Sequence, residues 1–139
     1  MRPEIRPVAA ADTYALRQQV LWPDRPLSYV QLPDDADGRH YGAFVGAELV
    51  SVVSLFGRGA EAQFRKFATH PGWQGRGIGS ALLRHLLDEA ARHGARRLWC
   101  DARQEKAGFY RRFGFEVEGV PFYKGPIPYV RMARGLSRP

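Results

Sequence analysis

Residues 67–83 read FATHPGWQGRGIGSALL, and they connect a predicted strand over residues 61–69 to a predicted helix that begins at Ile78. The connection contains Gly75, Gly77 and Gly79. Glycine lets a backbone come close to a ligand, and a helix N-terminus offers unpaired amide N–H groups and a partial positive charge. The stretch therefore predicts an anion-binding loop, and phosphate is the anion that suits it best.

Other structures also use glycines at this spacing. A turn that only connects strand to helix is the commoner use of such a triplet. A dinucleotide-binding fingerprint requires G-x-G-x-x-G, but the residue three positions after Gly77 is Ser80. A nucleotide P-loop requires Lys followed by Ser or Thr, and no such pair follows the glycines.

The helix after this loop has the clearest pattern in the chain. Its apolar residues recur with the helical period, its charged residues lie opposite, and Gly94 follows where a C-terminal cap belongs. One face of the helix should therefore pack against a core. That face consists of Ile78, Leu82, Leu83, Leu86, Leu87 and Ala90.

The chain before the loop is predicted to form mainly strands. Pro7 restricts the first strand to a sheet edge or marks the end of that strand, Asp12 is predicted as a helix N-cap, and Gly46 marks a hairpin turn. The expected elements are a strand over 4–8, a helix over 15–21, a long loop over 22–38 with about one helical turn, and strands over 41–45 and 49–56.

Strands and one helix are predicted after Gly94. They are a strand over 98–101, a helix over 105–113, and strands over 115–118 and 129–133, with the proline-rich residues 119–128 as a connection. This order of elements predicts a single α/β (α+β) domain over residues 1–139. Its sheet is expected to be mixed and mostly antiparallel, with one parallel pair at its centre.

Composition is that of an ordinary globular protein: 139 residues, of which 45% are hydrophobic, 25% charged and 12% aromatic. Cys100 is the single cysteine, which excludes an internal disulfide and a cysteine-based zinc site, and we expect no metal. The first twenty residues contain Glu4 and Asp12 and no long apolar run. We therefore expect no signal peptide, no membrane partner and a cytoplasmic location.

The positive charge is concentrated in the second half of the chain. Residues 1–70 contain eight Lys or Arg and eight Asp or Glu, whereas residues 71–139 contain thirteen and six, which places the whole formal net charge of +7 there. This asymmetry indicates an anionic partner. Eighteen of the twenty-one basic residues are Arg, however, a bias that codon composition alone also produces.

Residues 67–83 resemble the acetyl-coenzyme A binding segment of the GNAT superfamily of N-acetyltransferases. In that pattern Gln or Arg is followed by two residues, Gly, one residue, and Gly or Ala, as in Gln74, Gly77 and Gly79. Residues 107–115, AGFYRRFGF, resemble the family's Phe/Leu-Tyr-x-x-x-Gly-Phe element. Two such motifs in this order are far more specific than either alone. Residues 125–132 are similar to the ElaA-like branch of acyltransferases.

The resemblance implies a fold whose central parallel strands splay apart, with helices on both faces of the sheet. It implies acetyl-coenzyme A as co-substrate, with its pantetheine arm at the free strand edge and its pyrophosphate on the glycine loop. Arg103 stands where many members carry Asn, and it is expected to serve a phosphate or a backbone carbonyl instead. The residues assigned to cofactor binding are Phe67, Ala68, Thr69, Gln74, Gly75, Arg76, Gly77, Ile78, Gly79, Ser80, Arg103 and Phe109.

Tyr110 is the residue that the resemblance assigns to catalysis, as a general acid. A phenol is protonated at neutral pH and can donate to the leaving thiolate of coenzyme A. On a short helix an aromatic residue is usually part of the core, and without the motif packing would be the preferred interpretation.

No general base is assigned by the sequence. The acid–base candidates are Glu61, His70, His85 and Glu116, and water that relays the proton is an acceptable alternative. Cys100 would be needed for a two-step mechanism through an acyl-enzyme. A lone cysteine on a short strand is more often a buried hydrophobe, so direct transfer is favoured.

The sequence therefore predicts an acetyl-coenzyme A dependent N-acetyltransferase. Its acceptor is expected to be a primary amine of a small molecule or peptide, bound by the loops over 22–38 and 119–128. A non-catalytic acyl-coenzyme A binding module is the alternative, and a nucleic-acid binder is a weaker one because no recognition motif is present. A monomer or a homodimer is expected.

Overall fold

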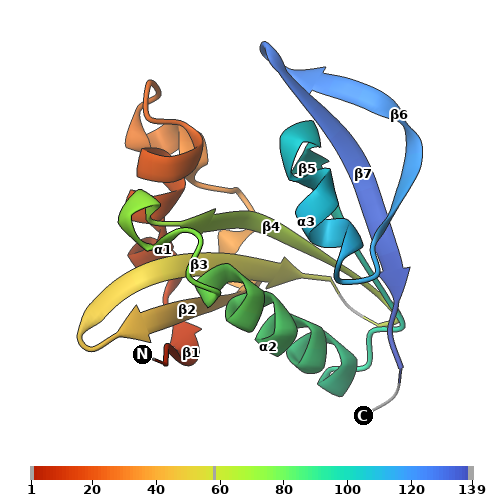
Figure 1. The fold of residues 1–139 in the computed structure, drawn as a ribbon, viewed down its shortest axis with the longest axis horizontal. Helices are drawn as coiled ribbons and strands as arrows, with labels where there is room; N and C mark the ends of the chain where they lie inside the picture. Colours follow the sequence, from red (N-terminus) through yellow and green to blue (C-terminus); the bar gives the residue numbers. More distant parts are fainter. Residues whose placement is uncertain (1, 58, 138–139) are drawn as a thin grey trace.

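The computed structural model describes residues 2–57 and 59–137, which form one seven-stranded mixed sheet with helices on both faces (Figure 1). The strand order is β1-β2-β3-β4-β5-β7-β6, and the predicted fold class is confirmed. The strands are β1 (Glu4–Val8), β2 (Arg39–Val45), β3 (Glu48–Phe56), β4 (Glu61–Thr69), β5 (Arg97–Arg103), β6 (Glu116–Lys124) and β7 (Ile127–Gly135). The α-helices are α1 (Ala10–Leu16), α2 (Ile78–Arg92) and α3 (Ala107–Arg111).

The two central strands, β4 and β5, are the parallel pair, and they separate soon after they begin. Only Glu61, Ala62 and Gln63 of β4 pair with β5, opposite residues 97–99. Beyond that point β4 stays paired with β3, and β5 stays paired with β7, so the two strands diverge (Figure 1). The predicted splay is confirmed.

A β-bulge interrupts β4 after this divergence. The register with β3 shifts between the Ser54–Arg65 and Val52–Ala68 pairs. Lys66, within the bulge, has a φ of 58°, a conformation that only glycines otherwise adopt among the described residues. The extra residue changes the alternation of β4, so that Phe64 and Phe67 both pack on the same core cluster.

Separate apolar cores lie on the two faces of the sheet. On one face Leu82 and Leu86 of α2 pack with Val53 of β3, in a cluster that also includes α3. On the other face Leu16 of α1 packs with Val52, the neighbouring residue of β3. Successive strand residues point to opposite faces, which is why one strand supplies both cores.

The N-terminal helix begins earlier than predicted. Ala9 occupies the N-cap position, so Asp12 lies at N3, and its Oδ2 accepts a hydrogen bond from the Ala9 N–H at 3.0 Å. The prediction of Asp12 as N-cap is therefore wrong, although a carboxylate at N3 satisfies an amide of the same turn. A π-helical turn over Arg17–Leu21 continues the helix, and the long loop contains short 3-10 turns over Leu27–Val30 and Asp35–Asp37.

The C-terminal hairpin is longer than predicted. Most of residues 119–128 belong to β6 and β7, so the prediction of a proline-rich connection there is wrong. Pro121 fits because β6 is an edge strand whose register shifts between Glu118 and Phe122. The helix predicted over 105–113 consists of a 3-10 turn, Gln104–Lys106, followed by the shorter α3.

A buried ion pair fastens the long loop to the sheet. The Arg17 guanidinium donates to both carboxylate oxygens of Asp35, at 2.8 and 2.9 Å, to the Val30 carbonyl at 2.9 Å and to Ser54 Oγ at 3.0 Å. Burial by itself would raise the pKa of Asp35, but the hydrogen bonds from Arg17 and from the Leu32 amide hold it below its ordinary value.

No helix among the described residues is long and apolar enough to cross a membrane.

Removal of the Asp35 carboxylate should destabilise the protein strongly. Asp35→Ala leaves a fully buried guanidinium without its counter-ion, a change that typically costs about 3–5 kcal/mol. Because the folded pKa is lowered, the carboxylate contributes stability above its unfolded pKa of about 3.9, and this contribution is lost as pH falls through the folded value. Urea unfolding at several pH values measures both effects.

Asp24→Ala, in the same loop but on an exposed residue, is the matched control and should change stability by at most about 0.5 kcal/mol. Equal stabilities of the two variants would contradict the role given to the buried pair.

Candidate functional site

A cleft of about 860 Å³ opens where β4 and β5 diverge. Its walls come from both central strands, the glycine loop, α3, the end of the N-terminal helix and the C-terminal hairpin. All the residues that the sequence assigned to the site line this cleft except Arg76 and Ile78. The fold therefore brings together two motifs that are far apart in the sequence.

The glycine loop at one end of the cleft has the geometry of an anion cradle. Gly75 and Gly77 have φ values of 75° and 80°, which glycine adopts without strain. Gly77 is the N-cap of α2, and no described side chain caps that helix end. The first amide groups of α2, including those of Gly79 and Ser80, are therefore free to bind an anion.

The side chains of the loop are used to hold its shape. Gln74 Nε2 donates to the Thr69 carbonyl at 2.9 Å and ties the loop to the end of β4. The Arg76 guanidinium lies over the Trp73 ring, 4.9 Å from its centroid, and Ile78 is buried in a core cluster. The Arg76 and Ile78 side chains thus stay out of the cleft, and only their backbone groups are available to a ligand.

Arg103 lies at the end of β5 and bonds within the protein. Its guanidinium donates to the Leu21 carbonyl and, at 3.4 Å, to the Tyr129 hydroxyl, and it lies 5.3 Å from the Trp22 ring centroid. The backbone carbonyl that Arg103 serves is therefore one of this chain. Its binding to the cofactor stays a prediction.

Tyr110, on α3, lines the cleft and is nearly surrounded by aromatic rings. The ring centroids of Phe109, Phe64 and Phe115 lie 5.2, 5.6 and 5.9 Å from its own. Its hydroxyl makes no hydrogen bond with any residue that the structure describes, and burial raises its pKa well above the usual value. Tyr110 is therefore both a packed ring and a protonated phenol at the cleft surface.

Cys100 also lines the cleft, from β5, and is 3% exposed. Burial, with a smaller effect from Asp101, raises the pKa of its thiol far above the usual value. A thiol in this setting is a poor nucleophile because little of it is ionised. The structure supports the interpretation of Cys100 as a buried hydrophobe.

None of the four candidate bases lines the cleft. Glu61 Oε1 is paired with the Arg97 guanidinium at 2.7 Å, and His70 Nδ1 accepts from the Gly72 amide at 3.0 Å. His85 packs against Tyr41, with ring centroids 5.4 Å apart. Each of these three groups already has a structural partner.

The sequence did not single out two lysines that line the cleft, Lys66 and Lys124. Burial, followed by the charges of Lys124 and Arg65, lowers the pKa of Lys66 to about 8. Burial also lowers the pKa of Lys124. The sequence did contain a signal for Lys66, because it is a charged residue in the middle of β4, a strand whose apolar residues pack on both faces of the sheet.

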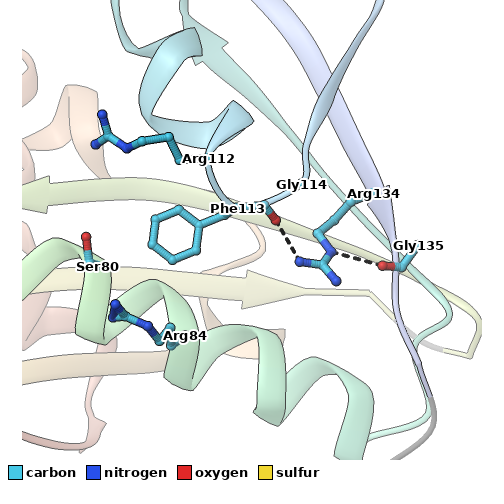
Figure 2. Close-up of a pocket in the computed structure, with 7 residues that line it drawn as sticks. All are labelled: Ser80, Arg84, Arg112, Phe113, Gly114, Arg134 and Gly135. Atoms are coloured by element: carbon cyan, nitrogen blue, oxygen red, sulfur yellow. Dashed lines mark hydrogen bonds between the residues drawn. The ribbon is translucent and has the colours of Figure 1, made fainter.

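A second pocket, of about 690 Å³, adjoins the glycine loop between α2 and the turn after α3 (Figure 2). Arg84, Arg112 and Arg134 line it, together with Ser80, which also lines the cleft. Arg134 is held in place by hydrogen bonds to the Phe113 carbonyl at 2.6 Å and the Gly135 carbonyl at 3.0 Å. This end of the site is therefore strongly basic.

Comparison with known proteins agrees with this geometry. The family model for the acetyltransferase (GNAT) family matches residues 8–115. The curated relative YitI of Bacillus subtilis, an uncharacterised N-acetyltransferase, is 29% identical over 128 residues, which cover 86% of each chain.

Solved structures show the same fold. A GNAT family acetyltransferase from Elizabethkingia anophelis with acetyl-CoA bound has a TM-score of 0.77 and 18% identity, and the match covers 97% of this chain and 99% of that one. Escherichia coli ElaA has a TM-score of 0.79 and 20% identity, over 95% of this chain and 99% of that one.

Substitution of Gly77 tests the anion cradle. In Gly77→Val the new Cβ meets no described heavy atom within 4 Å, but the branched side chain would stand before the free amides of α2 and would disfavour the left-handed backbone. We expect calorimetry to show 1:1 binding of acetyl-coenzyme A to the wild type and no binding to Gly77→Val.

Gly59→Val is the matched control. Gly59 also has a positive φ, 69°, and open space around it, but it does not line the cleft, so this variant should bear the same backbone strain and still bind. Wild-type affinity in Gly77→Val would show that the loop does not hold the ligand.

Proposed function

Because the chain belongs to the GNAT family of acetyltransferases, we propose that it transfers the acetyl group of acetyl-coenzyme A directly to a primary amine. The observation that carries the proposal is the cleft between β4 and β5, which has an anion cradle at one end and is lined by a protonated phenol. Bound acetyl-CoA in the Elizabethkingia anophelis neighbour supports the same co-substrate here.

In this proposal the chain binds the co-substrate mainly through its backbone. The free amides at the start of α2 hold the pyrophosphate, and the unpaired edge of β4 at Phe67, Ala68 and Thr69 pairs with the amides of the pantetheine arm. The 3′-phosphate faces the second pocket, where Arg84 and Arg112 supply positive charge (Figure 2).

The transfer itself requires one bond to form and one to break. The amine nitrogen bonds to the acetyl carbonyl carbon, the carbon–sulfur bond breaks, and the amine's proton leaves to water. Tyr110, which burial keeps protonated, donates its proton to the departing sulfur and then regains a proton from water.

A thiol-release assay with acetyl-coenzyme A and a panel of amines tests this function. Release that depends on an amine, with the acetylated amine found by mass spectrometry, is the expected result. Tight binding of acetyl-coenzyme A without turnover of any amine would favour the non-catalytic binding module. The cytoplasmic location and the oligomeric state stay predictions of the sequence.

Tyr110→Phe should lower kcat by about 100-fold or more, the usual cost of losing a positioned acid. Affinity for acetyl-coenzyme A should stay within a few-fold, since the ring still packs against its aromatic neighbours. Steady-state kinetics and calorimetry measure the two effects separately.

Tyr41→Phe controls for the loss of a phenol hydroxyl elsewhere, because Tyr41 donates to Glu89 at 3.3 Å and does not line the cleft. Unchanged turnover in Tyr110→Phe would assign Tyr110 to packing alone.

Cys100→Ala should retain turnover, because direct transfer uses no enzyme thiol and the pKa of this one is raised. Mass spectrometry of the wild type incubated with acetyl-coenzyme A and no amine should show no acetyl adduct on Cys100. A stable adduct, together with an inactive Cys100→Ala variant, would establish a two-step mechanism instead.

A further inference from the structure

The cleft has more positive charge than the co-substrate site accounts for. Six basic side chains line it, against two acidic ones, Asp101 and Glu105. Asp101 is already paired, since its carboxylate accepts from Arg131 Nε at 2.9 Å and from Arg131 Nη2 at 3.2 Å. The basic residues are Arg65, Lys66, Arg103, Lys106, Arg112 and Lys124.

Four of these cations gather away from the glycine loop, where the α1 side of the sheet meets the C-terminal hairpin. The Arg103 guanidinium donates to the Leu21 carbonyl, in the helical turn after α1, and to the Tyr129 hydroxyl of the hairpin, and the positive charges of Lys124, Arg65 and Arg103 all act on Lys66. The α1 side is the face opposite to α2 and the glycine loop. This cluster, Arg65, Lys66, Arg103 and Lys124, is therefore a second basic region across the sheet from the anion cradle.

The lysines of the cluster form no direct ion pair with a described residue, although the charge of Asp101 acts on Lys124. Among the described residues neither Lys66 nor Lys124 forms a salt bridge, whereas Arg65 has a weak one to Asp34 at 3.5 Å. Lys124 instead lies over the Tyr129 ring, 4.6 Å from its centroid. An unpaired cation that is partly buried costs free energy, so the fold keeps Lys66 in an unfavourable setting.

The backbone at Lys66 adds a second cost. A lysine at a φ of 58° is strained, and strained residues concentrate at functional sites. The strain occurs in the bulge that aims Lys66 into the cleft.

We propose that the acceptor is a small amine that also carries an anionic group, a carboxylate or a phosphate, and that this group binds between Lys66 and Lys124. The inference rests on the proposed acetyltransferase function and names its substrate class. The acceptor enters from the α1 side, opposite to the co-substrate, and its amine reaches the opening between β4 and β5 beside Tyr110.

The same cluster prepares the amine for attack. Nearby positive charges disfavour an ammonium ion, so they lower the pKa of the bound amine and increase its neutral, nucleophilic fraction. The anionic group of the acceptor offsets the repulsion that would otherwise exclude the amine. The lowered pKa of the bound amine explains how the reaction proceeds although none of the four candidate bases lines the cleft.

Matched pairs of acceptors test the substrate class by thiol release. An ω-amino acid is compared with its carboxamide, and phosphoethanolamine with ethanolamine. We expect kcat/KM to be at least tenfold higher for the anionic member of one or both pairs. The pair with the larger ratio shows whether the site prefers a carboxylate or a phosphate. Preference for the neutral members, or for a polyamine or an uncharged peptide amine, would overturn the proposal.

Charge-removing variants test the residues. Lys66→Asn is chosen because Asn tolerates the left-handed backbone, and Lys124→Gln lies on an edge strand. Each should raise the KM of the anionic acceptor about tenfold and leave the KM of acetyl-coenzyme A within twofold. Arg39→Gln, which removes one exposed cation outside the cleft, should change neither. Lys124→Glu should reverse the preference for the anionic over the neutral acceptor within each matched pair.

The outcomes separate this proposal from the general function. Turnover of neutral amines alone would leave the acetyltransferase function intact and remove the anionic acceptor. If no amine is turned over, calorimetry in the presence of coenzyme A measures whether the ω-amino acid or phosphoethanolamine binds, and this tests the anion site without turnover. Binding that is lost in Lys66→Asn supports the anion site, and absence of binding by the wild type overturns it.

Discussion

Three residue pairs join β4 to β5, and the cleft exists because the pairing stops there. A parallel pair that continued would use the backbone groups of both strands and would close the space between them. Instead β3 and β7 hold the outer edges of the two strands, and the inner edges separate. The divergence leaves β4 with free backbone groups, opens the sheet to both faces, and leaves the largely buried Cys100 and Tyr110 lining the same space.

The bulge at Lys66 determines which side chains β4 presents on each side of this opening. By changing the alternation of the strand it places Phe64 and Phe67 on the α2 side, where their ring centroids lie 5.6 and 6.4 Å from that of Tyr110. On the α1 side it places Lys66, whose charge interacts with those of Arg103 and Lys124. One extra residue thus sets the packing of the phenol and the charge of the opposite wall.

Local patterns in the sequence predicted the elements whose geometry is local. The glycine loop, α2 and the first hairpin follow from glycine positions and from periods of 3.6 and 2, and they were found where predicted. The missed features depend on distant partners. Arg103 bonds to the carbonyl of Leu21, and Lys66 acquires its setting from a bulge that breaks the period. The proline-rich strand β6 was missed because only its position at the sheet edge permits Pro121.

The positions of the three lysines indicate that the positive charge of the cleft is not explained by amino-acid composition alone. Eighteen of the twenty-one basic residues are Arg, so codon composition is a sufficient reason for most of the excess. The other three are Lys66, Lys106 and Lys124, and all three line the cleft. A lysine ammonium is a compact point charge on a flexible stem, whereas a guanidinium is planar and wide. All three lysines of the chain therefore lie in one cleft, beside the arginines Arg65, Arg103 and Arg112, and codon composition does not account for that placement.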